Sequence, residues 1–262
     1  MNESVIQRAV ELNDPGLAEA ALHEIDALLG SSSDTNERVY LLFSRASCYG
    51  ILGKFEEARE QLTSALREKP DDESSRITVD FMEGLLSQQE GKYAEALEKL
   101  SATLSKYRRQ LRLPELRFMY EDVQQRRAFL SVTLSKFPSA IPLLKECLTF
   151  GLEKELRSNT LASLGLCHLE LKDYEAARDC FLEAVALGLT KEWEGRAHFN
   201  LGIAYFYTDM VSEAKREFLL CEQLSAVHQL STVDIYAWLS IICTRLGEIS
   251  DSKRYAKIGK PN

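Results

Sequence analysis

SNTLASLGLCHLELKDYEAARDCFLEAVALGL (158–189) and GRAHFNLGIAYFYTDMVSEAKREFLLCEQLSA (195–226) are two versions of one pattern, displaced by 37 residues. The pair Leu164-Gly165 aligns with Leu201-Gly202, and Ala177 aligns with Ala214. Apolar and small residues recur at steps of three and four, which is the spacing of one helix face. Each segment therefore predicts two helices joined by a short polar turn.

The second half of this pattern occurs six times along the chain. A large apolar residue is followed three residues later by Ala or Ser, and four residues after that by another apolar residue. The six occurrences are Phe55-Ala58-Leu62, Tyr93-Ala96-Leu100, Phe137-Ala140-Leu144, Tyr174-Ala177-Phe181, Val211-Ala214-Phe218 and Ile249-Ser252-Ala256. The small residues are 38, 44, 37, 37 and 38 positions apart. A helical repeat of 37–38 residues with one longer step follows from this spacing.

Glycines mark two further features of the repeat. Gly53, Gly91 and Gly247 lie between the two helices of their units, where glycine suits the left-handed residue that ends a helix. Gly165 and Gly202 lie inside the first helices, where the absence of a side chain lets a neighbouring helix approach closely.

These features resemble the tetratricopeptide repeat, in which a Leu-Gly pair and a Tyr precede an Ala and a Phe. The resemblance covers about residues 38–259 and is best in the two quoted segments. The family repeat has 34 residues, so each unit here gains close to one helical turn. HEAT-like helix pairs have similar periods but lack this spacing. The resemblance implies an all-α fold, a right-handed α-α superhelix built as a solenoid of antiparallel helix pairs.

The same pattern predicts the organisation of the chain. Residues 1–30 are expected to form an N-terminal cap, a degenerate helix pair whose second helix starts at Asp14-Pro15. The polar residues 31–37 predict a linker. Residues 38–262 predict six repeats, the last of them a C-terminal cap with a polar second helix. At the one long step, Pro114 is expected to open a first helix that is longer by nearly two turns.

Composition favours a soluble, non-enzymatic protein. The six cysteines lie in apolar helical stretches without a Cys-x-x-Cys pair, as buried thiols in a reducing compartment do. Catalytic motifs are missing and the four histidines are isolated, so neither an enzyme nor a bound metal or cofactor is expected. No apolar run is long enough for a membrane helix or a signal core, which favours a cytoplasmic location.

The first helices supply the candidate binding residues. In tetratricopeptide-like arrays these helices line the concave groove, so the resemblance implies a partner-binding set there. Its members are Phe43, Phe81, Arg126, Phe129, Asn159, Arg196, Phe199, Asn200, Phe206 and Trp238. The alternative is that the aromatic members only pack against neighbouring repeats. The family's clamp for acidic C-terminal peptides is not expected, because Gln125 and Phe43 occupy places where lysines would be needed.

Charge is distributed unevenly along the chain. The net charge is −8, with −10 over residues 1–105 and +4 over residues 106–127. An acidic chain is a poor candidate for nucleic-acid binding. The basic island contains Arg108, Arg109, Arg112 and Arg117. Those arginines either complement helix dipoles or contact an acidic partner segment.

Taken together, the sequence predicts a scaffold or adaptor that binds a partner peptide or helix in the groove of the repeats. The alternative is a regulatory sensor, in which a small peptide binds the groove and changes the superhelix. The sequence leaves self-association into a homo-oligomer open.

Overall fold

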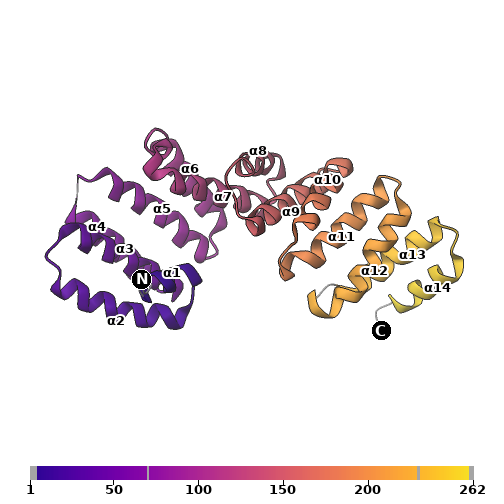
Figure 1. The fold of residues 1–262 in the computed structure, drawn as a ribbon, viewed down its shortest axis with the longest axis horizontal. Coiled ribbons are helices and arrows are strands. Elements are labelled where there is room, and N and C mark those ends of the chain that lie inside the picture. The colour runs from indigo at the N-terminus through magenta and orange to yellow at the C-terminus, as the bar shows by residue number, and fades with distance from the viewer. Residues whose placement is uncertain (1–4, 70, 229–230, 260–262) are drawn as a thin grey trace. The chain divides into compact units, whose positions relative to one another are not determined.

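The computed structural model describes residues 5–69, 71–228 and 231–259, and every regular element in these ranges is a helix (Figure 1). The chain divides into two compact units, residues 1–130 and 131–262. The boundary falls within helix α7 (Arg117–Thr133). The predicted all-α array of packed helix pairs is confirmed within each unit.

Unit 1 contains the first six α-helices, two 3-10 turns and most of α7. The elements are α1 (Val5–Leu12), α2 (Pro15–Ser31), α3 (Thr35–Ile51), α4 (Phe55–Glu68), α5 (Glu73–Gln89), α6 (Tyr93–Lys106), η1 (Gln110–Arg112) and η2 (Pro114–Leu116). The helices pack in sequential pairs, α1 with α2, α3 with α4 and α5 with α6, and α1 also contacts α3.

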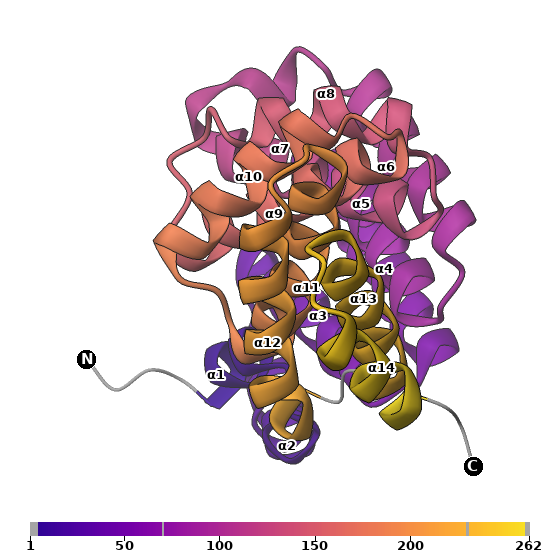
Figure 2. The same cartoon turned by 90° about the vertical axis from the view of Figure 1, so that its right-hand side faces the viewer.

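Unit 2 continues the same arrangement. The elements are α8 (Phe137–Cys147), α9 (Lys154–Glu170), α10 (Tyr174–Leu187), α11 (Lys191–Tyr207), α12 (Val211–His228), α13 (Thr232–Arg245) and α14 (Ile249–Ile258). Consecutive helices pack against one another, as Figure 2 shows for α12, α13 and α14.

Helix length accounts for the long period. The first helices α3, α5, α7, α9 and α11 each have 17 residues, and the second helices α4, α6 and α10 each have 14. Short connections join them, for example residues 171–173 and 188–190 around α10. The extra turn relative to a 34-residue repeat therefore lies in the helices themselves.

One hydrogen bond recurs at the turn of every repeat. The amide N–H of the residue before the second helix donates to a carbonyl five residues earlier, which closes the end of the first helix. The donor and acceptor pairs are Lys54 and Tyr49, Lys92 and Ser87, Lys136 and Ser131, Asp173 and His168, Met210 and Tyr205, and Glu248 and Cys243. Their distances are 2.8–2.9 Å. The donors repeat at the sequence spacing of 38, 44, 37, 37 and 38, so the predicted register is confirmed.

Left-handed residues complete these turns. Gly53, Gly91 and Gly247 have φ angles of 72°, 76° and 78°, as the sequence predicts. Lys172 and Asp209 adopt φ angles of 63° and 65° at the same place. The closing hydrogen bond therefore imposes the turn even where the residue has a Cβ that disfavours it.

Two boundary predictions were wrong. The linker is only Ser32 to Asp34, because Asp34 accepts hydrogen bonds from the amides of Asn36 and Glu37 and so starts α3 inside the predicted range. Pro114 does not lengthen the next first helix. It begins the 3-10 turn η2, and α7 starts three residues later with the ordinary 17 residues. The division of the chain into a cap and six repeats stays a prediction.

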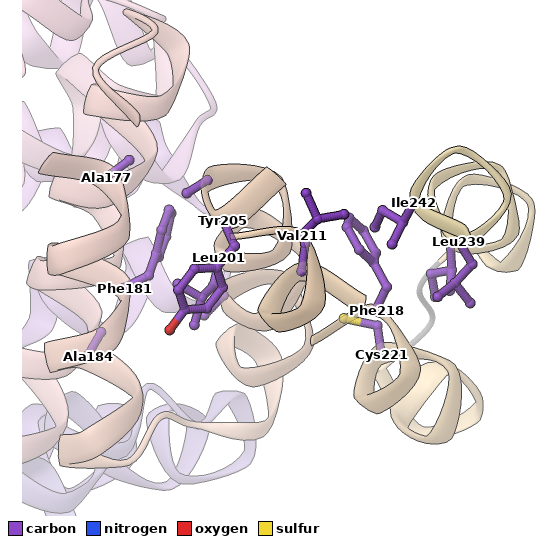
Figure 3. Packing of buried hydrophobic residues seen from close by; sticks show 14 of the residues in the cluster. Ala177, Phe181, Ala184, Leu201, Tyr205, Val211, Phe218, Cys221, Leu239 and Ile242 are labelled. Atoms are coloured by element: carbon purple, nitrogen blue, oxygen red, sulfur yellow. The ribbon is translucent and has the colours of Figure 1, made fainter. Parts of the chain in front are cut away.

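The core of unit 2 depends on contacts between each first-helix glycine and the following second helix. A Cβ added to Gly165 would lie 3.0 Å from the ring of Phe181, and one added to Gly202 would lie 2.8 Å from the ring of Phe218. Both rings are fully buried. Figure 3 shows Phe181 beside Leu201 and Tyr205, and the ring of Phe218 between Val211 and Ile242. The same contact occurs in unit 1 between Gly84 and Leu100.

Asp72 provides a test of helix capping. Its carboxylate accepts hydrogen bonds from the amide and the hydroxyl of Ser75, at 2.7 and 2.6 Å, and these bonds lower the pKa of Asp72. Asp72→Ala should lower the free energy of unfolding by about 1 kcal/mol at pH 7. Because the pKa is lowered in the folded state, this contribution is present above the ordinary value of 3.8 and is lost as pH falls through the lowered one.

Denaturant titrations of the wild type and the variant at neutral and acidic pH would measure this difference. Asp71→Ala is the matched control, because the Asp71 side chain is fully exposed and should contribute little. A difference between wild type and Asp72→Ala that persists at the lowest pH would contradict the role of the carboxylate.

Candidate partner-binding surfaces

A pocket of about 520 Å³ lies on the first helices of unit 1. It is lined by Val10, Asn13, Ser47, Ile51, Met82, Leu85, Leu86, Gln88, Gln89, Tyr93 and Arg126. These residues come from α1 and the residue after it, from α3, α5 and α7, and from the start of α6. Apolar walls therefore meet three amide side chains and one guanidinium. The exposed lining is more polar than apolar, so it suits a ligand that brings hydrogen-bonding groups together with apolar side chains.

Arg126 is held in place at this pocket. Its Nε lies 3.0 Å from a carboxylate oxygen of Asp122, one helical turn earlier, and its Nη1 lies 3.4 Å from Oε1 of Gln88 on α5. A guanidinium has five N–H donors in a fixed plane, so these contacts leave donors available for a ligand. Of the predicted groove residues, Arg126 is the one that lines the pocket.

The other predicted groove residues of unit 1 are partly buried in its core. Phe43 packs against two apolar clusters, one with Ala58 and Leu62 and one with Leu42 and Ala65. Phe81 also packs against two clusters, and Phe129 is half-buried on α7. None of the three lines the pocket.

The predicted aromatic residues of unit 2 form a packed group. The Phe199 ring meets Phe218 edge-on at 5.3 Å, and the Trp238 ring stacks on Phe218 at 5.6 Å. Phe206 lies edge-on to Trp238 at 5.4 Å, and the guanidinium of Arg245 lies 4.9 Å from the Phe206 ring. The structure brings these side chains together as inter-helix packing, and each remains only partly buried.

The predicted polar residues of unit 2 are more accessible. Arg196 is exposed and has no ion pair within the described part of the chain, and Asn200 is half-buried. The side-chain oxygen of Asn159 is buried and accepts no hydrogen bond from the described residues. A buried acceptor without a donor is unfavourable, so Asn159 would gain from a donor brought by a ligand or water.

The four arginines of the basic island are all exposed, between the end of α6 and the start of α7. Arg117 forms an ion pair with Glu121 at 2.9 Å. For Arg108, Arg109 and Arg112 no ion pair is found among the described residues.

Acidic side chains of the first 105 residues take part in ion pairs between helices. Arg59 on α4 contacts Glu83 at 3.4 Å and also contacts Glu90, while Lys99 on α6 lies 3.0 Å from Glu83. Burial opposes ionisation of Glu90, but hydrogen bonds from Lys92 and Arg59 outweigh it and lower its pKa. These carboxylates stabilise the packing of α4, α5 and α6.

The cysteines behave as the sequence predicts. Cys48, Cys147, Cys167, Cys221 and Cys243 are buried, Cys180 is half-buried, and none of these six described residues forms a disulfide bond. Burial raises the pKa of the Cys221 thiol to about 12, and it raises those of Cys48 and Cys167 to about 11. Thiols with such high pKa values are poor nucleophiles at neutral pH.

Metal-binding clusters and membrane-spanning helices are both absent from the described residues. Within them no three His, Cys, Asp or Glu side chains are grouped so that they could hold a metal ion. No helix among them combines the length and the apolar character needed to cross a membrane.

The sequence missed the contribution of α1 to the pocket. Val10 and Asn13 line it although they precede the first recognisable repeat. The signal was weak, because α1 is short and matches no repeat position. Ile6 and Ala9 pack in one cluster with Leu41 and Cys48 of α3, and this packing places Val10 beside the groove.

Comparison with known proteins identifies the repeat and the fold. The family model described as tetratricopeptide repeat matches residues 39–72 and 158–187. No curated protein sequence matches the chain significantly. Several solved structures share the fold at low sequence identity.

The apo form of RapI has a TM-score of 0.76 at 12% identity, covering 97% of this chain and 73% of RapI. The C-terminal part of a TPR repeat-containing protein from Cytophaga hutchinsonii has a TM-score of 0.66 at 13% identity, covering 96% and 92%. Residues 41 to the end of MamA from Desulfovibrio magneticus RS-1 give 0.56 at 18% identity, covering 74% and 98%. At these identities the likeness concerns the fold.

Proposed function

The chain is a tetratricopeptide-repeat protein, and on that premise we propose that it is a non-enzymatic scaffold or adaptor that binds a peptide segment of a partner protein. Stacked helical repeats present extended surfaces that such proteins use for binding. We place the main contact at the pocket of unit 1, between α1, α3, α5 and α7. That pocket is the observation that carries the proposal.

The pocket suits a peptide in size and chemistry. Its volume of about 520 Å³ lies in the range of ligand pockets and would hold a few side chains. Val10, Ile51 and Leu85 provide apolar walls. An extended peptide also needs partners for its backbone N–H and C=O groups, and the amides of Gln88 and Gln89 offer both donors and acceptors. Arg126 would bind a carboxylate or a carbonyl of the peptide.

Unit 2 contributes a second set of contacts in this proposal. Arg196, Asn200 and Asn159 are its polar members, and the partly exposed rings of Phe199, Phe206 and Trp238 add apolar surface. Because these rings also pack in the core, their truncation is a poor test of binding. Arg196→Glu combined with Asn200→Ala keeps the packing and is the better probe.

Two variants test the pocket directly. Peptides selected from a displayed library of random sequences of about twelve residues would be measured by fluorescence anisotropy against the wild type, Val10→Arg and Arg126→Ala. Val10 is 43% exposed, so an arginine there should fill the pocket without unfolding α1. We expect each variant to weaken binding at least about tenfold, or about 1.4 kcal/mol.

Matched controls exclude a general effect of charge or of α1. Leu12→Arg makes the same kind of change in α1 at a residue outside the pocket, and Arg67→Ala removes an exposed arginine from α4. Both should bind as the wild type does. The pocket is rejected if no peptide is selected, or if the selected peptides bind Val10→Arg and Arg126→Ala with unchanged affinity.

The position of α1 favours a second candidate function, that of a regulatory sensor. Val10 and Asn13 share the pocket with α3 and α5, so a bound peptide would contact the N-terminal helix and the repeats at once. Binding would then stabilise the docking of α1 on α3. Slower amide exchange in α1 on peptide binding supports the sensor, whereas unchanged exchange in α1 supports a rigid scaffold.

The proposal includes no catalytic step and no nucleic acid. It places the protein in the cytoplasm, in keeping with six cysteines that form no disulfide bond among the described residues and of which five are buried. We also propose that α1 and α2 act as the N-terminal cap of the array and that α13 and α14 act as its C-terminal cap.

A further inference from the structure

The segment between α6 and α7 is longer than the other connections, and backbone hydrogen bonds close turns along it. Residues 107–116 form the turns η1 and η2, and the amides of Leu111, Leu113 and Leu116 each donate to a carbonyl three or four residues earlier, at 2.9–3.1 Å. Tyr107 and Leu111 are buried in the cluster that contains Met119 and Val123. The segment is therefore anchored to the core of unit 1 at Tyr107 and Leu111.

Three positive charges on this segment are unpaired. Lys106 and Arg117, at its ends, form ion pairs with Asp80 at 2.8 Å and with Glu121 at 2.9 Å. The arginines between them, Arg108, Arg109 and Arg112, are exposed, and no ion pair involving them is found within the described residues. Glu115 is the single acidic residue of the segment and is also exposed. The local surplus of unpaired charge is therefore positive.

Two large apolar side chains within a few residues of these arginines in the sequence are also exposed. Leu113 is 51% exposed and Phe118 is 67% exposed, although Met119 next to it is buried. Tyr107 and Leu111 show that the segment can bury apolar residues where the fold requires it. An exposed phenylalanine and exposed arginines on one short segment combine features of a protein-binding surface, since both residue types are enriched at interfaces.

We propose that Arg108, Arg109, Arg112, Leu113 and Phe118, which we call the α6–α7 surface, bind a short acidic segment of a partner protein. Guanidinium groups bind carboxylates through paired hydrogen bonds, which accounts for the charged part of the contact. A leucine or aromatic side chain of the partner would cover Phe118 and Leu113. This site is separate from the pocket of the proposed function and does not rest on it.

Charge complementarity favours a short acidic peptide over a long polyanion. The island is preceded by 105 residues with a net charge of −10, and the whole chain carries −8. A nucleic acid or an anionic membrane extends beyond a single patch and would also meet the rest of a chain whose net charge is negative. A peptide of a few residues contacts the patch alone.

The experiment measures a fluorescent peptide of about eight residues, in which two leucines stand among glutamates and aspartates, by anisotropy at about 50 mM salt. The protein variants are Arg108→Glu with Arg112→Glu, and Phe118→Ser. A second peptide carries serine in place of both leucines. Lys253→Glu with Lys257→Glu is the matched control, because it makes the same change in net charge at exposed residues of α14.

We expect the arginine reversal to raise Kd at least about tenfold and the control pair to change it less than about twofold. Phe118→Ser should raise Kd for the leucine peptide about fivefold and leave the serine peptide unchanged, because the two apolar groups contact each other. Circular dichroism confirms that each variant is folded.

Several results would overturn the proposal. One is that the peptide does not bind, and another is that the control pair weakens binding as much as the arginine reversal does. A third is that Phe118→Ser affects both peptides equally. Finally, a single-stranded oligonucleotide or vesicles containing phosphatidylserine that displace the peptide at lower concentration than the unlabelled peptide would assign the surface to nucleic acid or lipid instead.

Discussion

Replacing Phe218 with alanine is expected to lower the free energy of unfolding by about 3–5 kcal/mol. The Phe218 ring is fully buried, with Phe199 at its edge, Trp238 stacked on its face and the backbone of Gly202 against it. Removing the ring takes contacts away from three helices, α11, α12 and α13, which cannot all close the cavity. The loss should therefore fall in the upper part of the range for buried residues.

Intrinsic fluorescence measures this effect selectively. The chain has two tryptophans, Trp193 and Trp238, and both belong to unit 2. A urea titration followed at these tryptophans reports the unfolding of unit 2 in the full-length protein. Ile241→Ala is the matched control, because it truncates a large apolar side chain at an exposed position of the same unit, and it should change stability by less than about 0.5 kcal/mol. A loss below about 1.5 kcal/mol for Phe218→Ala would show that the site relaxes easily.

Gly202→Ala is expected to destabilise the protein, although the same change normally strengthens a helix. Alanine inside a helix gains about 1 kcal/mol over glycine. At Gly202 the new methyl group would lie 2.8 Å from Cε2 and 3.0 Å from Cδ2 of Phe218. The ring is packed on both sides and cannot retreat, so overpacking should cost about 1–3 kcal/mol. Movement of α11 away from α12 would reduce the cost and loosen the repeat.

Two further variants decide whether the contact with Phe218 is the cause. Gly30→Ala is the control, because nothing lies within 4 Å of a Cβ at Gly30 in α2, and it should be neutral or stabilising. Gly202→Ala combined with Phe218→Leu should be more stable than the two single effects predict, with a coupling of about 1 kcal/mol. Additive effects, or a stabilising Gly202→Ala, would mean that the close approach is unimportant.

The sequence predicted the parts of the fold that local periodicity determines. Ala177, Phe181, Ala214 and Phe218 are buried on the second-helix face that the stripe indicated. The turn glycines adopt the expected left-handed angles. These features depend on residues within one repeat, where the spacing of residues along a helix determines which side of the helix their side chains occupy. The same local reasoning was wrong at Pro114. The extra residues of the 44-residue step form 3-10 turns that bury Leu111, and they do not lengthen the next helix.

The candidate site was predicted less well, because it depends on side chains that are distant in sequence. Arg126 contacts Gln88, which is 38 residues earlier in the sequence. Val10 lines the pocket only because α1 packs on α3. Periodicity places Phe206 and Trp238 on the first-helix face but cannot give their degree of burial. The burial of each ring depends on the side chains that pack against it, and here Phe206 and Trp238 pack against each other. Whether they also contact a ligand stays a prediction.

The sequential packing of the helices has a consequence for how the protein unfolds. Among the described residues of each unit, most of the helix pairs in contact are neighbours along the chain. Such a structure has no single core on which all of its helices depend. Unfolding can therefore begin at one helix and spread to the next one along the chain. In unit 2 the last described helix, α14, packs mainly against α13 and should exchange its amides first, while α11 and α12 exchange last. Local opening of α14 would then leave the contacts of Phe218 with Phe199 and Trp238 in place.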